Sequence, residues 1–594
     1  MDTILGIDLG TTNSVVSIIR DNDVQVLEED SQKILPSVVG LDAEGKLLVG
    51  FPALNQWTLA PDRTVRSIKR RMGSDETVSL GDQAYSPQEV SAIILRTLKE
   101  RAARQLGYEV CRAVITVPAF FNEQQREATR EAGQLAGLEV VRIINEPTAA
   151  ALTYNSSGQG LERLLVYDLG GGTFDVSIVQ IEDGVVEVLA SHGNTQLGGD
   201  DFDQLLMDYV CDRFQDEFSV DLRQSLASQS RVLRAVEEAK RQLSFEAFAT
   251  ITEEFIAEQA GVPLHLKMQI ARMDYEELIE SLLNKTLVCV DEALSDSKLV
   301  ASQIDRVVLV GGASRTPMVH RLLSEQLGQP IHAEVDPDLC VSMGAALQGG
   351  LIAGMDLGPV LVDITPHTLG VQCVGRLHGF ESEHRFAPLI NRNTALPAVR
   401  SEVFSTMYDS QDAVLVNVFQ GENEDVRHND QVGEFSLEGL ADVKAGNDIL
   451  IRFELDLDGI LKVTAVEKAT GLTKALTIDN AISRFRETER AGAKARIEAA
   501  FQPDDSTGEP IPSSHVPAVA GREDLSPELK QAIERANDLL AKSAGLASAA
   551  DPSDAEEMNR LAKQLRAAID AASLDELERV TAALDDLVFY LQDA

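Results

Sequence analysis

The sequence predicts a multidomain chain with a two-lobed α/β domain, then a β-sandwich, then a small α-helical bundle. A strand–turn–strand pattern occurs twice in the first 355 residues, at 4–19 and 164–179. Alternation of apolar residues with period two replaces helical periodicity after residue 366. Apolar residues at helical spacing follow capping boxes within residues 526–594. A chain of 594 residues also exceeds what one hydrophobic core supports, so several domains are expected.

Composition narrows the classes of function. The formal net charge is −42, from 53 Lys and Arg against 95 Asp and Glu, which argues against nucleic acid as a main ligand. Hydrophobic residues make up 44%, which is ordinary for a folded protein. The five cysteines are scattered without a Cys-x-x-Cys pair, which favours inert thiols in a reducing compartment. The chain shows neither a signal-type N-terminus nor an apolar run of about 20 residues, so we expect a cytoplasmic protein with no membrane partner.

The repeated unit predicts the site. Asp8-Leu9-Gly10-Thr11 and Asp168-Leu169-Gly170-Gly171 each follow an apolar, β-branched run. Such Gly/Thr turns offer backbone N–H groups and hydroxyls to phosphate oxygens, while the two carboxylates suit a hydrated divalent metal. Neither a P-loop nor a dinucleotide-binding motif is present. We therefore expect a nucleoside triphosphate between two similar lobes.

The remaining elements follow in chain order. Residues 1–355 alternate strands such as 113–118 with helices such as 87–106, which begins after a capping Ser86. A short apolar segment between breakers, 356–366, predicts a linker. Residues 367–500 predict the β-sandwich, with a strand at 414–419 and a hairpin over 449–466 whose turn is Asp458-Gly459. Pro-rich residues 501–525 predict a flexible tether, and 526–594 a lid-like three-helix bundle.

Longer motifs around the turns resemble a known family. Residues 6–14 read GIDLGTTNS, 143–151 read IINEPTAAA, and 168–175 read DLGGGTFD. Residues 197–203 read LGGDDFD, and 310–317 read VGGASRTP. Together they resemble the seventy-kilodalton heat-shock (DnaK-like) chaperones from residue 2 to about 480, in the manner of a divergent bacterial-type member. The resemblance implies an actin-like and hexokinase-like ATPase domain, a β-sandwich for peptides and a helical lid.

The resemblance also assigns residues. It implies a slow, peptide-stimulated ATPase that uses ATP/ADP, Mg²⁺ and K⁺. The implied catalytic residues are Lys69, Glu146, Asp168 and Thr173. The implied metal-binding residues are Asp8, Asp168 and Asp175. The implied nucleotide-binding residues are Gly10, Thr11, Thr12, Asn13, Gly170, Gly171, Gly172, Gly198, Gly199, Glu237, Lys240, Arg241, Ser244, Gly311, Gly312, Arg315 and Asp338.

A second site and a coupling path are implied in the same way. The resemblance makes one set the walls and arch of a groove for extended apolar peptides: Val371, Val374, Phe404, Met407, Val414 and Val416. It makes another set the path between domains: Pro118, Arg142, Val360, Leu361, Val362 and Asp363. The partners it implies are unfolded polypeptide clients, a J-domain co-chaperone and a nucleotide exchange factor.

Two other functions are compatible with a two-lobed nucleotide cleft. One is a nucleotide-binding co-chaperone or exchange factor of the same fold with little turnover. The other is a metabolite kinase, which would leave the β-sandwich and linker without a purpose. The presence of Lys69, Glu146, Thr173 and the three aspartates favours ATP hydrolysis coupled to peptide binding.

Overall fold

The computed structural model describes residues 3–154, 160–331, 336–355, 357, 360–457, 459–477, 487–501 and 581. The chain divides into one compact unit, Met1–Pro503, and a second, Asp504–Ala594. The expected tether and helical bundle lie outside the described residues, apart from Phe501 and Thr581. Every described helix is too short or too polar to cross a lipid bilayer.

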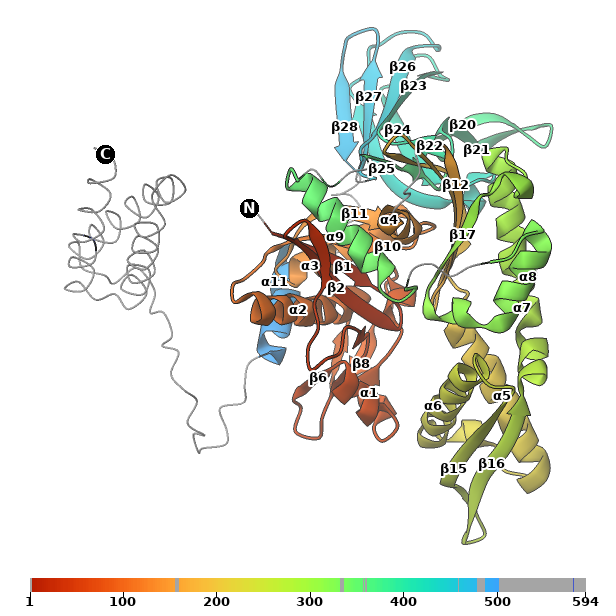
Figure 1. The fold of residues 1–594 in the computed structure, drawn as a ribbon. Coiled ribbons are helices and arrows are strands. Elements are labelled where there is room, and N and C mark those ends of the chain that lie inside the picture. Colours follow the sequence, from red (N-terminus) through yellow and green to blue (C-terminus); the bar gives the residue numbers. More distant parts are fainter. Residues whose placement is uncertain are drawn as a thin grey trace, which may run out of the picture. The chain divides into compact units, whose positions relative to one another are not determined.

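Two sheets repeat one strand arrangement, which confirms the predicted duplication (Figure 1). Each sheet contains a three-strand antiparallel meander whose first two strands are joined by one of the Asp-Leu-Gly turns. A further strand pairs in parallel with the first strand of the meander. The first sheet contains β1 (Ile4–Leu9), β2 (Asn13–Arg20), β3 (Asp23–Val26), β4 (Leu35–Pro36), β10 (Arg112–Val117) and β11 (Glu139–Asn145). The second contains β12 (Glu162–Leu169), β13 (Phe174–Glu182), β14 (Val185–Asn194), β17 (Arg306–Val310) and β18 (Val360–Val362).

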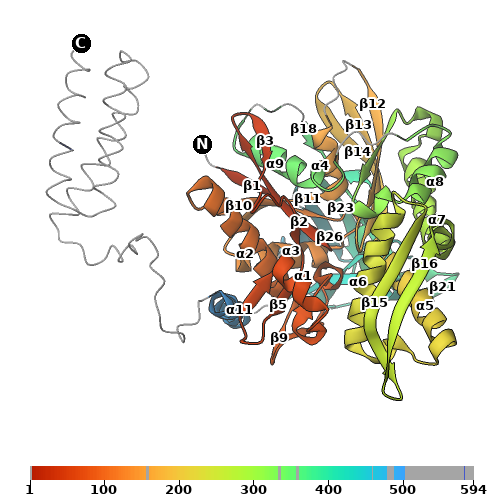
Figure 2. The same cartoon turned by 60° about the horizontal axis from the view of Figure 1, so that its bottom comes forward.

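Helices cover both faces of the two sheets (Figures 1 and 2). A core shared by both sheets encloses α4 (Glu146–Thr153) and α9 (Cys340–Ile352). Backbones touch here: a Cβ on Gly6 would lie 2.1 Å from the Ala346 nitrogen, and one on Gly344 would lie 1.8 Å from the Ala149 oxygen. The other helices are α1 (Phe51–Trp57), α2 (Pro87–Leu106), α3 (Glu123–Leu135), α5 (Gly199–Phe218), α6 (Leu226–Leu243), α7 (Arg272–Ser297), α8 (Pro317–Leu327) and α11 (Glu487–Ala500). The Ser86 side chain caps α2 in a capping box with Glu89, which confirms the predicted helix.

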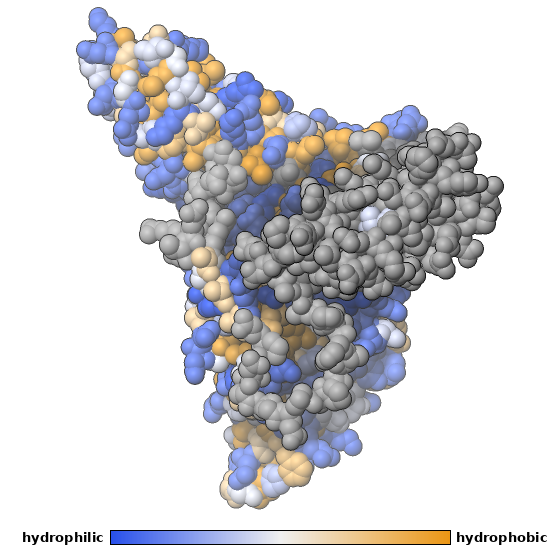
Figure 3. Space-filling view, turned by 90° about the vertical axis from the view of Figure 1, so that its left-hand side faces the viewer, coloured by the Kyte–Doolittle hydropathy of each residue, from blue (hydrophilic) through white to orange (hydrophobic). Residues whose placement is uncertain are grey.

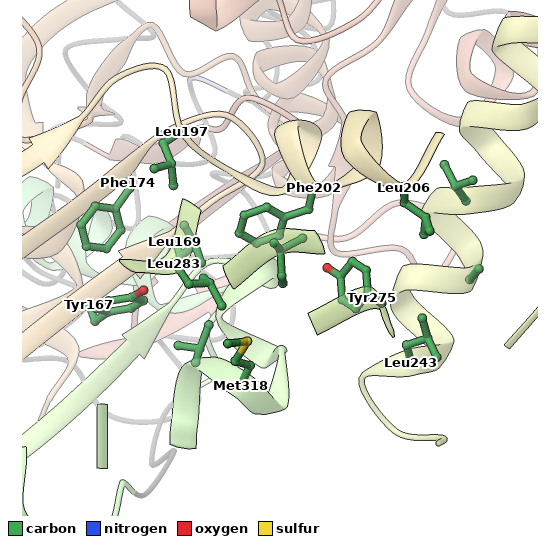
Figure 4. Close-up of a cluster of buried hydrophobic side chains, with 14 of the residues drawn as sticks. Tyr167, Leu169, Phe174, Leu197, Phe202, Leu206, Leu243, Tyr275, Leu283 and Met318 are labelled. Carbon is green, nitrogen blue, oxygen red and sulfur yellow. The ribbon is translucent and has the colours of Figure 1, made fainter. Parts of the chain in front are cut away.

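The largest core lies on the outer face of the second sheet. Aromatic and aliphatic side chains of the sheet meet those of α5, α6, α7 and α8 there (Figure 4). The labelled members are Tyr167, Leu169, Phe174, Leu197, Phe202, Leu206, Leu243, Tyr275, Leu283 and Met318. This packing holds β12 and β13, and therefore the turn between them, in a rigid frame. The coloured residues in Figure 3 include many hydrophilic side chains, with apolar ones gathered in patches among them.

Smaller elements complete this part of the chain. Short strands are β5 (Val39–Leu41), β6 (Leu47–Val49), β7 (Thr64–Val65), β8 (Val78–Leu80) and β9 (Gln83–Tyr85), and a long hairpin consists of β15 (Phe248–Gln259) and β16 (Val262–Ala271). The 3₁₀ turns are η1 (Pro61–Arg63), η2 (Ile68–Arg71), η3 (Leu222–Gln224), η4 (Ala301–Gln303), η5 (Gly312–Arg315) and η6 (Val426–His428).

The linker segment joins the second sheet as β18. It pairs in parallel with β14, with Val360 opposite Val185 and Val362 opposite Glu187. Of the expected linker, residues 356, 358 and 359 lie outside the described residues. An exposed apolar strand is costly, so pairing at a sheet edge gives this segment a favourable position.

Residues 364–477, called the β-module here, form two facing four-stranded sheets around one core. One sheet has β20 (Leu369–Leu377), β21 (Phe380–Ile390), β24 (Ala413–Gln420) and β25 (Asp430–Glu438). The other has β23 (Ala398–Ser405), β26 (Asp448–Leu455), β27 (Leu461–Glu467) and β28 (Thr473–Thr477); β19 (Ile364–Thr365) pairs with β22 (Thr394–Ala395). The predicted strand at 414–419 and hairpin over 449–466 are confirmed.

Two details differ from the sequence expectation. The first strand of the hairpin ends at Leu455 and the second begins at Leu461, so the connection is longer than the expected two-residue turn, of which Asp458 lies outside the described residues. The Asp456 N–H donates to the Ile460 carbonyl, and the Gly459 N–H donates to the Asp456 carbonyl. The strands also end at Thr477, whereas the β-sandwich was expected over 367–500. Helix α11 buries Ala493 and Ile497 in the core that contains α2 and α3, and Arg496 pairs with Glu89 at 2.6 Å. Ala493 and Ile497 are four residues apart and therefore lie on one face of the helix, which is the face that packs against α2 and α3.

Candidate functional site

Both glycine turns open onto one cavity between the two sheets. It offers about 80 Å³ to the centres of water molecules, enough for several waters or phosphate-sized groups, because one water needs about 10–15 Å³ on this measure. The predicted residues that line it are Asp8, Gly10, Thr11, Thr12, Asn13, Lys69, Glu146, Asp168, Gly170, Gly171, Thr173, Gly311, Gly312 and Asp338. The fold therefore brings most of the predicted set together, from segments up to 330 residues apart.

The turns touch each other so closely that side chains are excluded. A Cβ on Gly171 would lie 1.8 Å from the Thr12 hydroxyl oxygen, and one on Gly10 would lie 2.1 Å from the Asn13 carbonyl oxygen. Backbone N–H groups can therefore face the cavity directly, which is how glycine-rich turns hold phosphate. The Thr12 hydroxyl is buried without a hydrogen-bond partner. A phosphate oxygen is the kind of group that would satisfy it.

The N-terminus of α5 supports the second turn from behind. The Gly199 N–H donates to the Gly170 carbonyl at 3.0 Å, and the Asp200 N–H donates to the Gly171 carbonyl at 2.6 Å. A Cβ on Gly198 would lie 2.6 Å from the Gly171 backbone. Gly172 is also outside the cavity lining, with Arg70 against it. These glycines thus shape the turn rather than line the cavity.

The cavity concentrates buried negative charge around one lysine. Asp168, Asp175 and Glu146 are buried and Asp8 is half-buried. The Lys69 ammonium, also buried, pairs with the Glu146 carboxylate. Burial, with Glu146 adding to it, raises the pKa of Asp8 to about 7. The same two causes raise the pKa of Asp175 to about 7 and that of Asp168 well above its usual range. The site therefore favours additional positive charge.

The donor set fits hydrated cations rather than a directly ligated transition metal. Within the described residues, no three His, Cys, Asp or Glu side chains converge to hold one ion. Asp8 accepts a hydrogen bond from the Thr116 hydroxyl at 3.0 Å, and Asp175 accepts one from the Phe120 N–H at 3.0 Å. Each keeps further oxygen capacity, which hard cations such as Mg²⁺ use through water.

Ion pairs close the cleft from both lobes. Arg66 pairs with Glu237 at 2.9 Å and stacks on Trp57 at 4.2 Å. Ser67 donates to Asp200 at 2.6 Å, and Arg70 pairs with Asp201 at 3.0 Å. These contacts tie the η2 segment, and with it Lys69, to the opposite lobe.

Helix α6 and the Arg315 loop lie beside the cavity rather than in its lining. Lys240 pairs with Asp203 at 2.6 Å and reaches the Gly199 carbonyl at 3.1 Å. Arg241 pairs with Glu237 at 2.5 Å, and the Ser244 hydroxyl contacts the Lys240 carbonyl. Arg315 pairs with Asp338 at 2.7 Å, and Asp338 does line the cavity. Apart from Asp338, these predicted nucleotide-binding residues thus lie outside the cavity lining and are called the rim residues here.

Sequence reasoning missed several residues of the site. Val310, Pro337 and Val341 line the cavity, yet apolar residues carry no chemical signal in a sequence. Arg66 and Thr116 were missed because their partners lie on distant segments. The position of Val310 directly before the Gly311-Gly312 pair was the one available hint.

The linker reaches the residue that precedes Glu146. The Asn145 amide donates to both carboxylate oxygens of Asp363, at 3.1 and 3.0 Å, and Arg126 donates to Asn145 at 2.7 Å. Burial raises the pKa of Asp363. Arg142 extends to the Leu457 carbonyl of the β-module at 3.5 Å, and Pro118 directly follows β10. Asp363 therefore contacts the residue beside Glu146, and Arg142 contacts the β-module.

The six predicted groove residues divide into two groups. Val371, Val414 and Val416 share one face of their sheet, because Val371 pairs with Val418 in the ladder and side chains alternate with period two. Phe404 faces the same core from β23, opposite Ile449. Val374 and Met407 are exposed by 38% and 46%.

Comparisons with known proteins agree over nearly the whole chain. A family model described as Hsp70 protein matches residues 4–80 and 76–593. The chain is 41% identical over 597 residues to the chaperone protein DnaK of Thermotoga neapolitana, covering 98% of this chain and 95% of that protein. It is 40% identical to the chaperone protein DnaK of Thermotoga maritima over the same shares. It is 44% identical to that of Thermosipho melanesiensis over 483 residues, 80% of each chain.

The buried charge balance gives a stability prediction. Lys69→Met should lower the free energy of unfolding by about 3 kcal/mol at pH 8 in EDTA, because Glu146 and the three aspartates then lose the buried ammonium of Lys69. Adding Glu146→Gln should recover most of that loss, since the orphaned charge is removed. Urea unfolding of the four proteins of this cycle measures the coupling. Simple additivity of the two substitutions would contradict the assigned pair.

Proposed function

The chain belongs to the Hsp70 family, and we propose that it is a chaperone whose affinity for extended apolar peptides is switched by ATP binding and hydrolysis. One observation carries the proposal. The linker strand β18 is hydrogen-bonded to β14, in the same sheet whose β12–β13 turn faces the cavity. A change at that turn is thereby connected through one sheet to the segment that leads into the β-module.

The cavity suits positioning of a triphosphate. The turns at Gly10–Asn13 and 170–172 would hold the phosphates, and the rim residues Glu237, Lys240, Arg241, Ser244 and Arg315 would hold the nucleoside. Mg²⁺ would be held through water by Asp8 and Asp168, and K⁺ beside Asp175. These cations supply the charge that neutralises the terminal phosphate. Three buried carboxylates and the half-buried Asp8 lie around Lys69, and this excess of negative charge supports the assignment.

Hydrolysis would depend on orientation rather than covalent chemistry. Lys69 is held by Glu146 and lines the cavity, so it would contact a terminal phosphate and an attacking water bound there. The Thr173 hydroxyl lies on the second turn and lines the same cavity. Glu146 would accept or orient the water's proton, and Lys69 would stabilise the developing charge. The family's ATPase activity agrees with this use of the site.

Coupling to the β-module would pass through the linker. Asp363 is bound by Asn145, and the next residue, Glu146, belongs to the cavity. Movement of Glu146 on loss of the terminal phosphate would therefore alter the Asn145–Asp363 contact. Release of β18 from β14 would then free the β-module to hold a peptide. Clients with extended apolar segments, a J-domain co-chaperone and an exchange factor are the partners that we propose.

The catalytic assignment predicts a separation of binding from turnover. Thr173→Ala should leave ATP affinity within about threefold and lower turnover by about 10²-fold, because it removes one transition-state donor. Binding is measured by calorimetry and turnover by phosphate release. Arg71→Ala is the control, since the Arg71 side chain is 50% exposed and lies outside the cavity lining. Equal turnover in Thr173→Ala and Arg71→Ala would remove Thr173 from the mechanism.

The groove assignment predicts loss of peptide binding. Val414→Phe should weaken an apolar heptapeptide at least tenfold by filling the pocket, while basal ATP turnover stays within twofold. Leu415→Phe is the control, because the neighbouring side chain points to the other face and is 57% exposed. Fluorescence anisotropy of a labelled peptide measures the affinity. Unchanged affinity in the Val414 variant would exclude this groove.

A further inference from the structure

Phe120 lies between two histidines, one from each side of the boundary with the β-module. His367, just after β19, places its ring 4.5 Å from the Phe120 ring at 64°. His192, on β14, stacks against Phe120 at 6.2 Å and 28°. Phe120 itself follows β10 and precedes α3, in the loop that also carries Pro118. The nucleotide function proposed above makes no use of either histidine.

The backbone of Phe120 links the β-module to the cavity. The His367 Nε2 lies 3.1 Å from the Phe120 carbonyl oxygen, so the imidazole donates to it in the tautomer with the proton on Nε2. The Phe120 N–H donates in turn to Asp175 at 3.0 Å. One residue therefore accepts from the β-module and donates to a buried carboxylate beside the cavity. Any shift of Phe120 changes the hydrogen bonding of Asp175.

His192, which stacks on the Phe120 ring, is itself held by two carboxylates. Its Nε2 lies 2.9 Å from Asp296 and its Nδ1 3.2 Å from Glu292, both on α7. Asp296 also accepts from Arg392 at 3.1 Å and from Asn393 at 2.9 Å, both in the β-module. The contacts on both faces of Phe120 thus depend on the seating of the β-module, that is, on its contacts with Phe120 and Asp296.

We propose that His367 is a positioning residue that holds Phe120 and thereby transmits the seating of the β-module to Asp175. The proposal rests on the function proposed above, because Asp175 matters there as a cation-binding carboxylate. His367 touches no reacting atom, and it acts through the Phe120 carbonyl. The contact requires a proton on Nε2, and burial favours the neutral imidazole that carries it there.

The contact should weaken in acid. Burial lowers the pKa of His367, and Arg126 adds to this, while the Phe120 carbonyl, Glu422 and Asp430 oppose it. Seating against Phe120 is therefore favoured above the ordinary histidine pKa of about 6.5 and is lost progressively below it. Glu123, at the same boundary, contributes a pH dependence of the opposite sign, because burial and Asp456 raise the pKa of Glu123 to about 7. Variants at His367 separate the two, since Glu123 is present in all of them.

The experiment uses the full chain with His367→Leu and His367→Gln. Hydrogen exchange of the Phe120 amide, without nucleotide, should be about tenfold faster in the Leu variant, because loss of one hydrogen bond frees the loop. Gln retains a donor and should stay within threefold of the unsubstituted chain. With ATP, the ratio of peptide-stimulated to basal turnover should fall at least threefold in the Leu variant. His378→Gln, at an exposed hairpin tip, should change neither quantity.

The pH dependence of peptide stimulation distinguishes this role of His367 from a purely structural one. Between pH 7.5 and 5.5 the stimulation ratio should fall in the unsubstituted chain and fall less in His367→Gln. Two results would overturn the proposal. One is equal hydrogen exchange of the Phe120 amide in the Leu variant and the unsubstituted chain. The other is a fall of the stimulation ratio in His367→Gln as large as that in the unsubstituted chain. If the unsubstituted chain does not turn over ATP, the proposed function fails, while Phe120 exchange still decides the His367 contact.

Discussion

The structure depends on a concentration of buried negative charge around the Lys69–Glu146 pair. Asp8 and Asp168 line the same cavity, at the two glycine turns where the halves of a duplicated strand pattern meet, and Asp175 lies beside it. Cations or protons stabilise such an arrangement, because the carboxylates repel one another strongly when all are ionised. Cations and a nucleotide would supply that balance, so the proposed ligand also completes the site electrostatically.

The same constraint explains how a distant module can respond. The linker adds a strand to the sheet that carries one turn, and Asp363 is bound by the residue beside Glu146. Separately, Phe120, in the loop after β10, donates to Asp175 and accepts from His367 of the β-module. Two short hydrogen-bonded paths therefore lead from the charged cavity to residues 364–477. A rearrangement of charge in the cavity would be felt along both.

Much of the fold could be predicted from local patterns, because those patterns repeat or have strong capping signals. The duplicated Asp-Leu-Gly turns and the capped helix α2 are of this kind. The Arg66–Glu237 and His367–Phe120 contacts could not be predicted, since their partners lie 171 and 247 residues apart and neither member is unusual in its local sequence. The packing of α11 on α2 and α3 was missed because the preceding strands suggested that the β-module continued to residue 500. The apolar lining, such as Val341, was missed because apolar residues have many possible uses.

The most direct test of the account is the magnesium dependence of ATP binding, measured by titration calorimetry on the full chain. Excess charge in the cavity predicts binding in the micromolar range or tighter with Mg²⁺, and at least tenfold weaker binding when EDTA removes the metal. Binding should also protect the backbone amides of residues 360–363 from hydrogen exchange, because the linker strand is then held on β14. Equal affinity with and without the metal, or no binding at all, would contradict the central claim.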